Sequence, residues 1–289
     1  MRKQVFALAV ALASLGATKS TSFVDDHSLN DAQRYDRCLK LAHDNPDFAD
    51  EQALAWHDAG GGPAAMHCSA VALVQLKQYA QAAFKFDALA RESDAGGAGI
   101  RADLLDQAGN AWILAGQPEN AEASLGAALN LGNRSADVYA DRARARAMKK
   151  NWAGAESDLN AALKVDPDRA DLLVLRASAR HALGQRTQAR ADIDQAIALD
   201  PKYGEALVER GAMKLESGDR NGARGDWQVV LVVQPNSPAA DTARMYIEKL
   251  ELGGQKARRP MRPKSTPTPK APPGQSPPVH NVFPAPGTP

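Results

Sequence analysis

Apolar residues recur at helical spacing in paired runs from residue 63 to residue 237, and a short polar turn separates the two runs of each pair. The last three pairs close on Pro167, Pro201 and Pro235, which are 34 residues apart. Proline cannot continue a helix and disfavours helical angles in the residue before it. A fixed period of this size predicts one helical hairpin copied and stacked, which favours a binding surface over an active site.

Counting back from the prolines divides the repeated region into five units: 63–96, 102–135, 136–169, 170–203 and 204–237. The first two units have Asp94 and Asn133 in place of the proline, and a five-residue insert, 97–101, separates them. A turn is expected at the fifteenth position of every unit, occupied by Lys77, Gly116, Lys150, Gly184 and Gly218. Each unit is therefore predicted to be two antiparallel helices joined at that position.

Helices are also predicted on both sides of the repeated region. Residues 30–62 are expected to form a divergent helical hairpin. Residues 238–252 are expected to form a capping helix, with Ser237 as its N-cap and with Gly253 and Gly254 ending it. Such a helix would cover the last unit, whose apolar side has no further repeat to pack against.

Small residues dominate positions 8, 20 and 27 of the units, where thirteen of fifteen residues are Ala or Gly. The fifteen are Ala70, Ala82, Leu89, Gly109, Ala121, Ala128, Ala143, Ala155, Ala162, Ala177, Ala189, Ala196, Gly211, Ala223 and Val230. Small side chains on facing helices let the backbones approach closely. Because a hairpin this thin cannot bury its apolar face alone, the units must stack.

The 34-residue period, the small residues at positions 8, 20 and 27 and the closing proline resemble the tetratricopeptide repeat family over residues 63–237. The resemblance implies an all-α fold, an α-solenoid of stacked antiparallel helix pairs that winds into a superhelix. Members of the family bind an extended or helical segment on the concave face, which their first helices form. A protein or peptide partner is therefore expected.

The family's ligand-facing positions 2, 5 and 9 supply the candidate binding residues. They include Asp103, Asp106, Asn110, Asp137, Arg144, Asp171, Ser178 and Glu205. Position 2 is acidic in four consecutive units, which forms a ladder of carboxylates suited to a basic ligand. An acid in the first turn also stabilises a helix through its dipole whatever binds, and this simpler explanation is preferred. Only Asn110 matches the Lys and Asn residues with which some members clamp a C-terminal carboxylate, which argues against recognition of a chaperone tail.

Three units share a basic pair at positions 7 and 11 and an aspartate at position 23. These sets are Arg142, Arg146 and Asp158; Arg176, Arg180 and Asp192; and Arg210, Lys214 and Asp226. The first two units have Ser69, Leu73 and Lys85, and Ala108, Trp112 and Ser124, instead. Because the charges occur together or not at all, we predict a partly buried ion pair between the helices of each hairpin, with the arginine at position 7 as the main partner. Exposed charges that share a period through copying are the alternative.

Cys38 and Cys68 are the only two cysteines, and both fall in predicted helices near the start of the array. In an exported protein they would form one disulfide, which is the preferred prediction. Two buried free thiols are the alternative.

The N-terminus predicts export. Arg2 and Lys3 precede an apolar stretch of 13 residues, 5–17, which is typical of a signal peptide over residues 1–20. An uncleaved helix lying along the membrane is the alternative. The expected location is the bacterial periplasm or the outside of the cell, with no stable membrane span once the signal is removed.

Charge is segregated along the chain, although the formal net charge is only +1. Residues 25–253 hold 26 basic and 34 acidic residues, whereas residues 254–289 hold six basic residues, no acid and eleven prolines. The tail, 253–289, is therefore predicted to be disordered and locally polyproline-like. It could act as a spacer, bind an aromatic groove or an anionic partner, fold back on the acidic body, or have no partner. No nucleic acid is expected, because no aromatic residues interleave the basic ones.

Catalytic and cofactor signatures are missing from the sequence. The six histidines show no metal-ligand spacing, and no phosphate loop, nucleophile elbow or paired-carboxylate motif occurs. His67 and Cys68 are adjacent, but neighbours on a helix point in different directions. We expect no enzyme activity and no cofactor or metal, and we predict a protein-interaction scaffold or adaptor of the cell envelope. A self-assembling structural component, or an accessory subunit of an enzyme whose catalytic chain is separate, are the alternatives.

Overall fold

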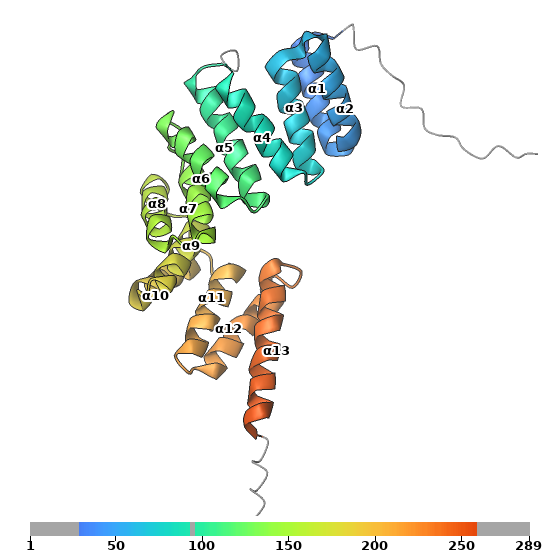
Figure 1. The fold of residues 1–289 in the computed structure, drawn as a ribbon. Coiled ribbons are helices and arrows are strands. Elements are labelled where there is room, and N and C mark those ends of the chain that lie inside the picture. Colours follow the sequence, from blue (N-terminus) through green and yellow to red (C-terminus); the bar gives the residue numbers. More distant parts are fainter. Residues whose placement is uncertain (1–28, 93–95, 259–289) are drawn as a thin grey trace, which may run out of the picture.

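The computed structural model of the protein describes residues 29–92 and 96–258, and these form a curved array of helix pairs (Figure 1). The helices are α1 (Asp31–Asp44), α2 (Pro46–Trp56), α3 (Gly62–Gln75), α4 (Tyr79–Arg91), α5 (Ala98–Leu114), α6 (Pro118–Asn130), α7 (Ala136–Met148), α8 (Trp152–Val165), α9 (Ala170–Ala182), α10 (Arg186–Leu199), α11 (Gly204–Glu216), α12 (Arg220–Val233) and α13 (Pro238–Arg258), with a π-helical segment η2 (His57–Gly61) after α2. The two described ranges contain no β-strand. The predicted all-α solenoid is confirmed. The predicted signal segment, 1–20, and the tail beyond residue 258 lie outside the described residues.

The turn inside each unit has the same left-handed backbone. The φ angles at the fifteenth positions are 60° at Lys77, 70° at Gly116, 60° at Lys150, 77° at Gly184 and 90° at Gly218. The amide of the following residue then bonds back to the carbonyl at position 11, as Gln117 N does to Trp112 O at 2.9 Å. This Schellman-type motif ends the first helix of every unit in the same way and fixes where the second helix begins.

The small residues at positions 8, 20 and 27 form the core in which the helices meet, and all fifteen are buried. Two of them are glycines for a visible reason. A Cβ atom on Gly109 would overlap the Leu125 side chain, and one on Gly211 would overlap the indole of Trp227. The helices of these hairpins therefore approach closely enough that even alanine meets the large residue at position 24.

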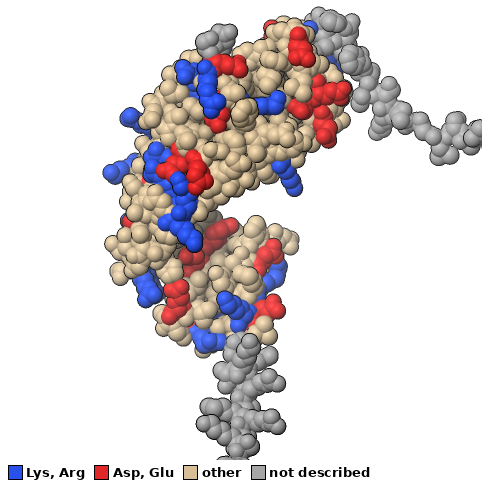
Figure 2. Space-filling view, viewed as in Figure 1, with Lys and Arg blue, Asp and Glu red and all other residues tan. Residues whose placement is uncertain are grey.

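Two pairs of first helices from neighbouring units contact one another, α5 with α7 and α9 with α11, whereas no two consecutive second helices of the described residues do so to the same extent. In a curved stack the more closely spaced row lies on the inner side. The first helices therefore line the inner surface, and the hollow that they border is visible in Figure 2.

The capping helix is longer than predicted. α13 continues through Gly253 and Gly254 to Arg258, so the expected stop at the two glycines is wrong. Glycine weakens a helix by about 1 kcal/mol relative to alanine, but it keeps its amide donor and does not end a helix by itself. The 97–101 insert likewise becomes helical, since it supplies the first turn of α5. Within residues 29–92 and 96–258, none of the helices is both long enough and apolar enough to span a bilayer.

Candidate functional site

The candidate binding residues lie on four first helices. Asp103, Asp106 and Asn110 are on α5, and Asp137 and Arg144 are on α7. Asp171 and Ser178 are on α9, and Glu205 is on α11. The carboxylates of α5 and α7 are close enough for their charges to affect one another. The four helices together do not form one continuous ladder of free carboxylates.

An acidic cluster lies at the junction of α5 and α7 and consists of Asp103, Asp106, Asp137 and Asp141. Burial of Asp106, together with the negative charges of Asp141, Asp103 and Asp137, raises the pKa of this carboxyl to about 6. The side chain of Asn110 approaches the same carboxyl, with its Nδ2 3.3 Å from Asp106 Oδ1. Asp106 therefore carries a negative charge at neutral pH that its surroundings disfavour, and a cation placed there would relieve that unfavourable energy.

Arg144 and Asp141 modify this cluster. Asp141 is buried, and the Arg144 guanidinium donates to its carboxylate from one turn further along α7. The sequence argument included Arg144 but missed Asp141, because position 6 is not one of the family's ligand-facing positions. The hydrophobic pattern offered a signal: an aspartate at a helix position that faces neighbouring helices requires a partner.

Arg169 neutralises the middle of the predicted ladder. Its guanidinium binds Asp171 through Nε and Nη2, at 2.8 and 2.7 Å, and reaches Asp137 through Nη1 at 3.0 Å. These hydrogen bonds hold the pKa of Asp171 below its usual range. Asp103, at the start of the ladder, accepts from Asn133 Nδ2 at 3.2 Å. Sequence reasoning missed Arg169 because it precedes its helix and lies outside the positions that the family uses.

The far end of the inner surface differs again. The Ser178 hydroxyl donates to Val174 O in its own helix at 3.1 Å, and Glu205 is exposed. Glu209, one turn after Glu205, has its pKa raised by burial. His181 of α9 and Glu216 of α11 approach to 2.8 Å across the same surface. In the acidic cluster, arginines bind the two α7 acids, Asp137 and Asp141, whereas Asp103 and Asp106 of α5 have only neutral hydrogen-bond partners.

The three predicted ion pairs are present in the structure, and each aspartate is buried, with 3%, 3% and 5% of Asp158, Asp192 and Asp226 exposed. Arg176 binds Asp192 through Nε and Nη2 at 3.0 and 2.7 Å, and Arg180 adds Nη1 at 2.8 Å. The arginine at position 7 makes the two-pronged contact, as the sequence argument expected. The aspartate thus joins both basic residues of the pair.

The charge network also links successive units, which the sequence argument missed. Arg146 Nε donates to Glu122 of the preceding unit at 2.8 Å, and Arg180 Nε donates to Glu156 at 2.9 Å. Both glutamates occupy position 21. The last junction lacks this link because position 21 of the fourth unit is Arg190. Position 21 is Glu in the second and third units and Arg in the fourth, and this pattern could have predicted the links. It can be interpreted only once the units are known to stack in this register.

The second unit replaces the charge network with neutral donors. Trp112 Nε1 donates to Asp87 Oδ2 at 2.7 Å, and Ser124 Oγ donates to Asp87 Oδ1 at 2.8 Å. Trp112 and Ser124 occupy the positions of the second arginine and the aspartate, while Asp87 comes from the unit before. All three are buried, so this small network also connects two units.

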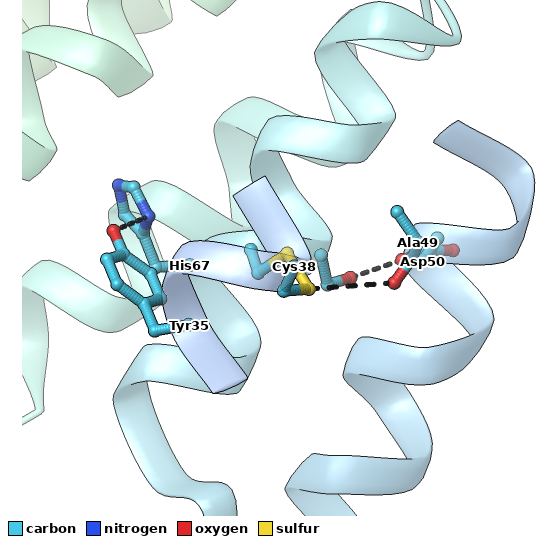
Figure 3. The surroundings of a disulfide bond; sticks show 7 residues. Tyr35, Cys38, Ala49, Asp50 and His67 are labelled. Carbon is cyan, nitrogen blue, oxygen red and sulfur yellow. Dashed lines mark hydrogen bonds between the residues drawn. A yellow bond between two sulfur atoms is a disulfide. The ribbon is translucent and has the colours of Figure 1, made fainter. Parts of the chain in front are cut away.

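The disulfide joins the N-terminal hairpin to the array (Figure 3). Cys38 of α1 and Cys68 of α3 are bonded, with their Cα atoms 6.1 Å apart. On either side, the Tyr35 hydroxyl lies 2.8 Å from His67 Nδ1, and Ser69 donates to Asp50 of α2. His67 Nε2 meets Gln107 Oε1 of α5 at 3.0 Å, so His67 links three helices rather than pairing with Cys68. Burial lowers the pKa of His67.

Groups of His, Cys, Asp and Glu that could hold a metal ion are absent from residues 29–92 and 96–258. Many of the charged side chains there are instead paired with one another. On the face shown in Figure 2, acidic and basic side chains are mixed over the middle of the array.

No family model matches this chain, and no curated protein matches it. Solved structures do resemble it.

The tetratricopeptide repeat protein TTC0263 of Thermus thermophilus aligns with a TM-score of 0.51 and 21% identity, over 63% of this chain and 95% of that one. YrrB, described as a tetratricopeptide repeat protein with an unusual peptide-binding site, aligns with a TM-score of 0.50 and 17% identity, over 70% and 96%. MamA of Desulfovibrio magneticus RS-1, from residue 41 to its end, aligns with a TM-score of 0.51 and 17% identity, over 58% and 93%. At these identities the likeness concerns the fold. This chain therefore has the fold of the tetratricopeptide repeat proteins.

Proposed function

We propose that this protein is a non-catalytic scaffold that holds a basic segment of a partner protein on its inner surface. The main support for this proposal is the acidic cluster at α5 and α7. Burial and the neighbouring negative charges raise the pKa of Asp106 in this cluster to about 6. A lysine or arginine entering the cluster would meet Asp103, Asp106 and Asp137 from two consecutive units. The curved surface allows an extended segment to contact several units at once.

We also propose that the protein works in the cell envelope after export. The charged start and apolar stretch of residues 1–20 support export. A buried disulfide is typical of proteins that mature in an oxidising compartment. Cell fractionation, with mass spectrometry of the mature N-terminus, tests this part. Recovery of an uncleaved chain with reduced cysteines from the cytoplasm would contradict it.

Binding of synthetic peptides by calorimetry tests the scaffold proposal. A peptide of about 12 residues with alternating Lys and Ala should bind the full chain, and the same peptide with Glu in place of Lys should not. The double variant Asp103→Asn/Asp106→Asn should weaken binding about tenfold or more, since each charge contact at a partly desolvated site contributes about 1 kcal/mol. Glu119→Gln, an exposed acid on the second helix α6, is the matched control and should change nothing.

The chain's own basic tail could compete for this surface. A chain ending at Arg258 should therefore bind the Lys peptide at least as tightly as the full chain. Equal binding of the Lys and Glu peptides, or an unchanged affinity in the double Asn variant, would reject the inner acidic cluster as the binding site.

A further inference from the structure

The outer side of the array has grooves between consecutive second helices, and charged residues bridge two of them. Between α6 and α8, Arg146 binds Glu122 on one side and Asp158 on the other, both at 2.8 Å. Between α8 and α10, Arg180 spans Glu156 and Asp192 in the same way, at 2.9 and 2.8 Å. These guanidinium groups fill the grooves and satisfy the acids that border them.

The groove between α4 and α6, here called the α4–α6 groove, has no such bridge. Trp112 stands at the arginine position, Ser124 at the aspartate position and Ala83 at the glutamate position. Both Trp112 and Ser124 direct their donors inward to Asp87, so none of the three presents a free polar group. A cavity of about 640 Å³ remains here, lined by residues of α4, α5 and α6 that include Phe84 and Trp112. A second cavity of about 550 Å³ lies beside it, where Phe84 and Trp112 meet Met66 of α3.

Phe84 makes the α4–α6 groove unusual, because 63% of this large apolar residue is exposed. The same position of the other units holds small residues, Ala123, Ser157, Ala191 and Gly225. The repeat therefore does not require a phenylalanine at this point. Covering an aromatic side chain of this size would contribute a large apolar area to an interface.

The charges around the α4–α6 groove indicate what covers it. Arg91 and Arg101 line the cavity in the α4–α6 groove, and Lys85 and the exposed Glu92 line the cavity beside it. We propose that the α4–α6 groove binds a segment of a partner protein that carries large apolar side chains flanked by carboxylates. A second copy that paired through the same groove would bring the same three cations to the interface, and the chain's own tail holds six basic residues and no acid. Like charges disfavour both of these occupants.

A pair of amphipathic peptides tests the proposal. The first, of about 14 residues, has Leu and Phe on one helical face and Glu at both ends; the second has Lys in place of Glu. Fluorescence anisotropy with the full chain should show binding of the Glu peptide and binding at least about tenfold weaker of the Lys peptide. Phe84→Ala should weaken the Glu peptide about tenfold or more, as expected for a central aromatic contact.

A matched pair of surface variants keeps the test independent of folding. Ala123 and Ala191 are both exposed residues at position 22 of their units, on α6 and α10. Ala123→Glu places bulk and negative charge in the α4–α6 groove and should abolish binding of the Glu peptide, whereas Ala191→Glu should leave it unchanged. Circular dichroism should show equal helicity for both variants.

Three results would overturn the proposal. The first is equal binding, or no binding, of the Glu and Lys peptides. The second is a dimer in sedimentation that Phe84→Ala dissociates, which would make a second copy the occupant. The third is binding that appears only after residues 259–289 are removed, which would make the tail the occupant. The site is separate from the acidic inner cluster, so Asp103→Asn/Asp106→Asn should not affect it.

Discussion

The first two repeat units and the last three reach the same geometry with different chemistry. In the first two, a disulfide, Trp112 and hydroxyl donors occupy the places where the helices meet. In the last three, buried aspartates hold pairs of basic side chains at the same positions. The turn is the same throughout, with a left-handed residue at position 15 in all five units. Small core residues and this turn therefore determine the hairpin, while the polar positions are free to differ.

The difference has a consequence for the surface. Charged bridges close the outer grooves in the middle of the array, while neutral contacts leave the α4–α6 groove open and apolar. Different side chains at three positions of the repeat therefore distinguish an open groove from a bridged one.

Asp192→Ala should lower the free energy of unfolding by about 3–5 kcal/mol. Asp192 is 3% exposed and accepts from both Arg176 and Arg180, so its removal leaves two partly buried cations without their shared anion. Urea denaturation followed by circular dichroism measures the loss.

Two variants control for the lost packing. Arg176→Leu/Asp192→Leu should lose less than about 2 kcal/mol, since Arg180 keeps Glu156 and both apolar residues are well accommodated. Asp226→Ala should lose about 2–3 kcal/mol, because its partners Arg210 and Lys214 are more exposed and no glutamate extends the network. Equal, small losses in all three would show that the charges contribute little to stability.

Cys38→Ala/Cys68→Ala should destabilise the N-terminal region by about 3–4 kcal/mol, the chain-entropy value for a loop of 30 residues. The loss should be local. Hydrogen exchange should speed up in α1 and α2 and stay unchanged in α9 to α13, because repeat units depend on their neighbours only. Reducing the wild-type protein is the matched control and should give the same pattern. Faster exchange throughout the array would contradict this local role of the disulfide.

The hairpins, their register and their core could be predicted from the sequence, because small residues and prolines act at fixed positions within one unit. The three ion pairs could also be predicted, since both partners recur in each unit. The links between units could not be predicted in this way. Glu122 acquires its meaning only when the next unit packs on it, and Arg169 depends on the path of the chain before α9. Asp87 forms its bonds with residues 25 and 37 positions away, which no single-unit pattern contains.

The candidate site could be predicted only in part. Positions 2, 5 and 9 identified the helices that line the inner surface, and α5 and α7 do bring Asp103, Asp106 and Asp137 together. They did not show which carboxylates are already paired. That property depends on residues outside these positions, such as Arg169 and Asn133. The α4–α6 groove was missed because it results from substitutions at three separate positions.

Close packing is common to both regions, and Gly211→Ala tests it. Alanine favours a helix by about 1 kcal/mol over glycine, but the new Cβ would overlap the Trp227 indole. We expect a net loss of about 1–3 kcal/mol from overpacking. Gly225→Ala in α12, where nothing lies within 4 Å of the new Cβ, should stabilise by about 0.5–1 kcal/mol. Thermal unfolding of the two variants measures both. A stabilised Gly211→Ala variant would mean that the helices can separate without cost.

The smallest expected effect concerns Asp106 and depends on pH. Its pKa of about 6 in the folded protein lies above the ordinary 3.8, so between these values the folded state binds more protons than the unfolded state. Stability therefore decreases as the pH rises from about 4 to about 7, and the contribution of Asp106 is about 1–2 kcal/mol once its partial exposure is considered.

Asp106→Asn should remove this contribution, making the variant more stable than wild type at neutral pH but not at the acidic end of this range. Asp171→Asn is the opposite control. Because Arg169 lowers the pKa of Asp171, removing the Asp171 carboxylate should destabilise the folded protein at neutral pH. If both variants respond to pH alike, the two carboxylates have the same surroundings in solution, and Asp106 does not differ from the arginine-bound Asp171.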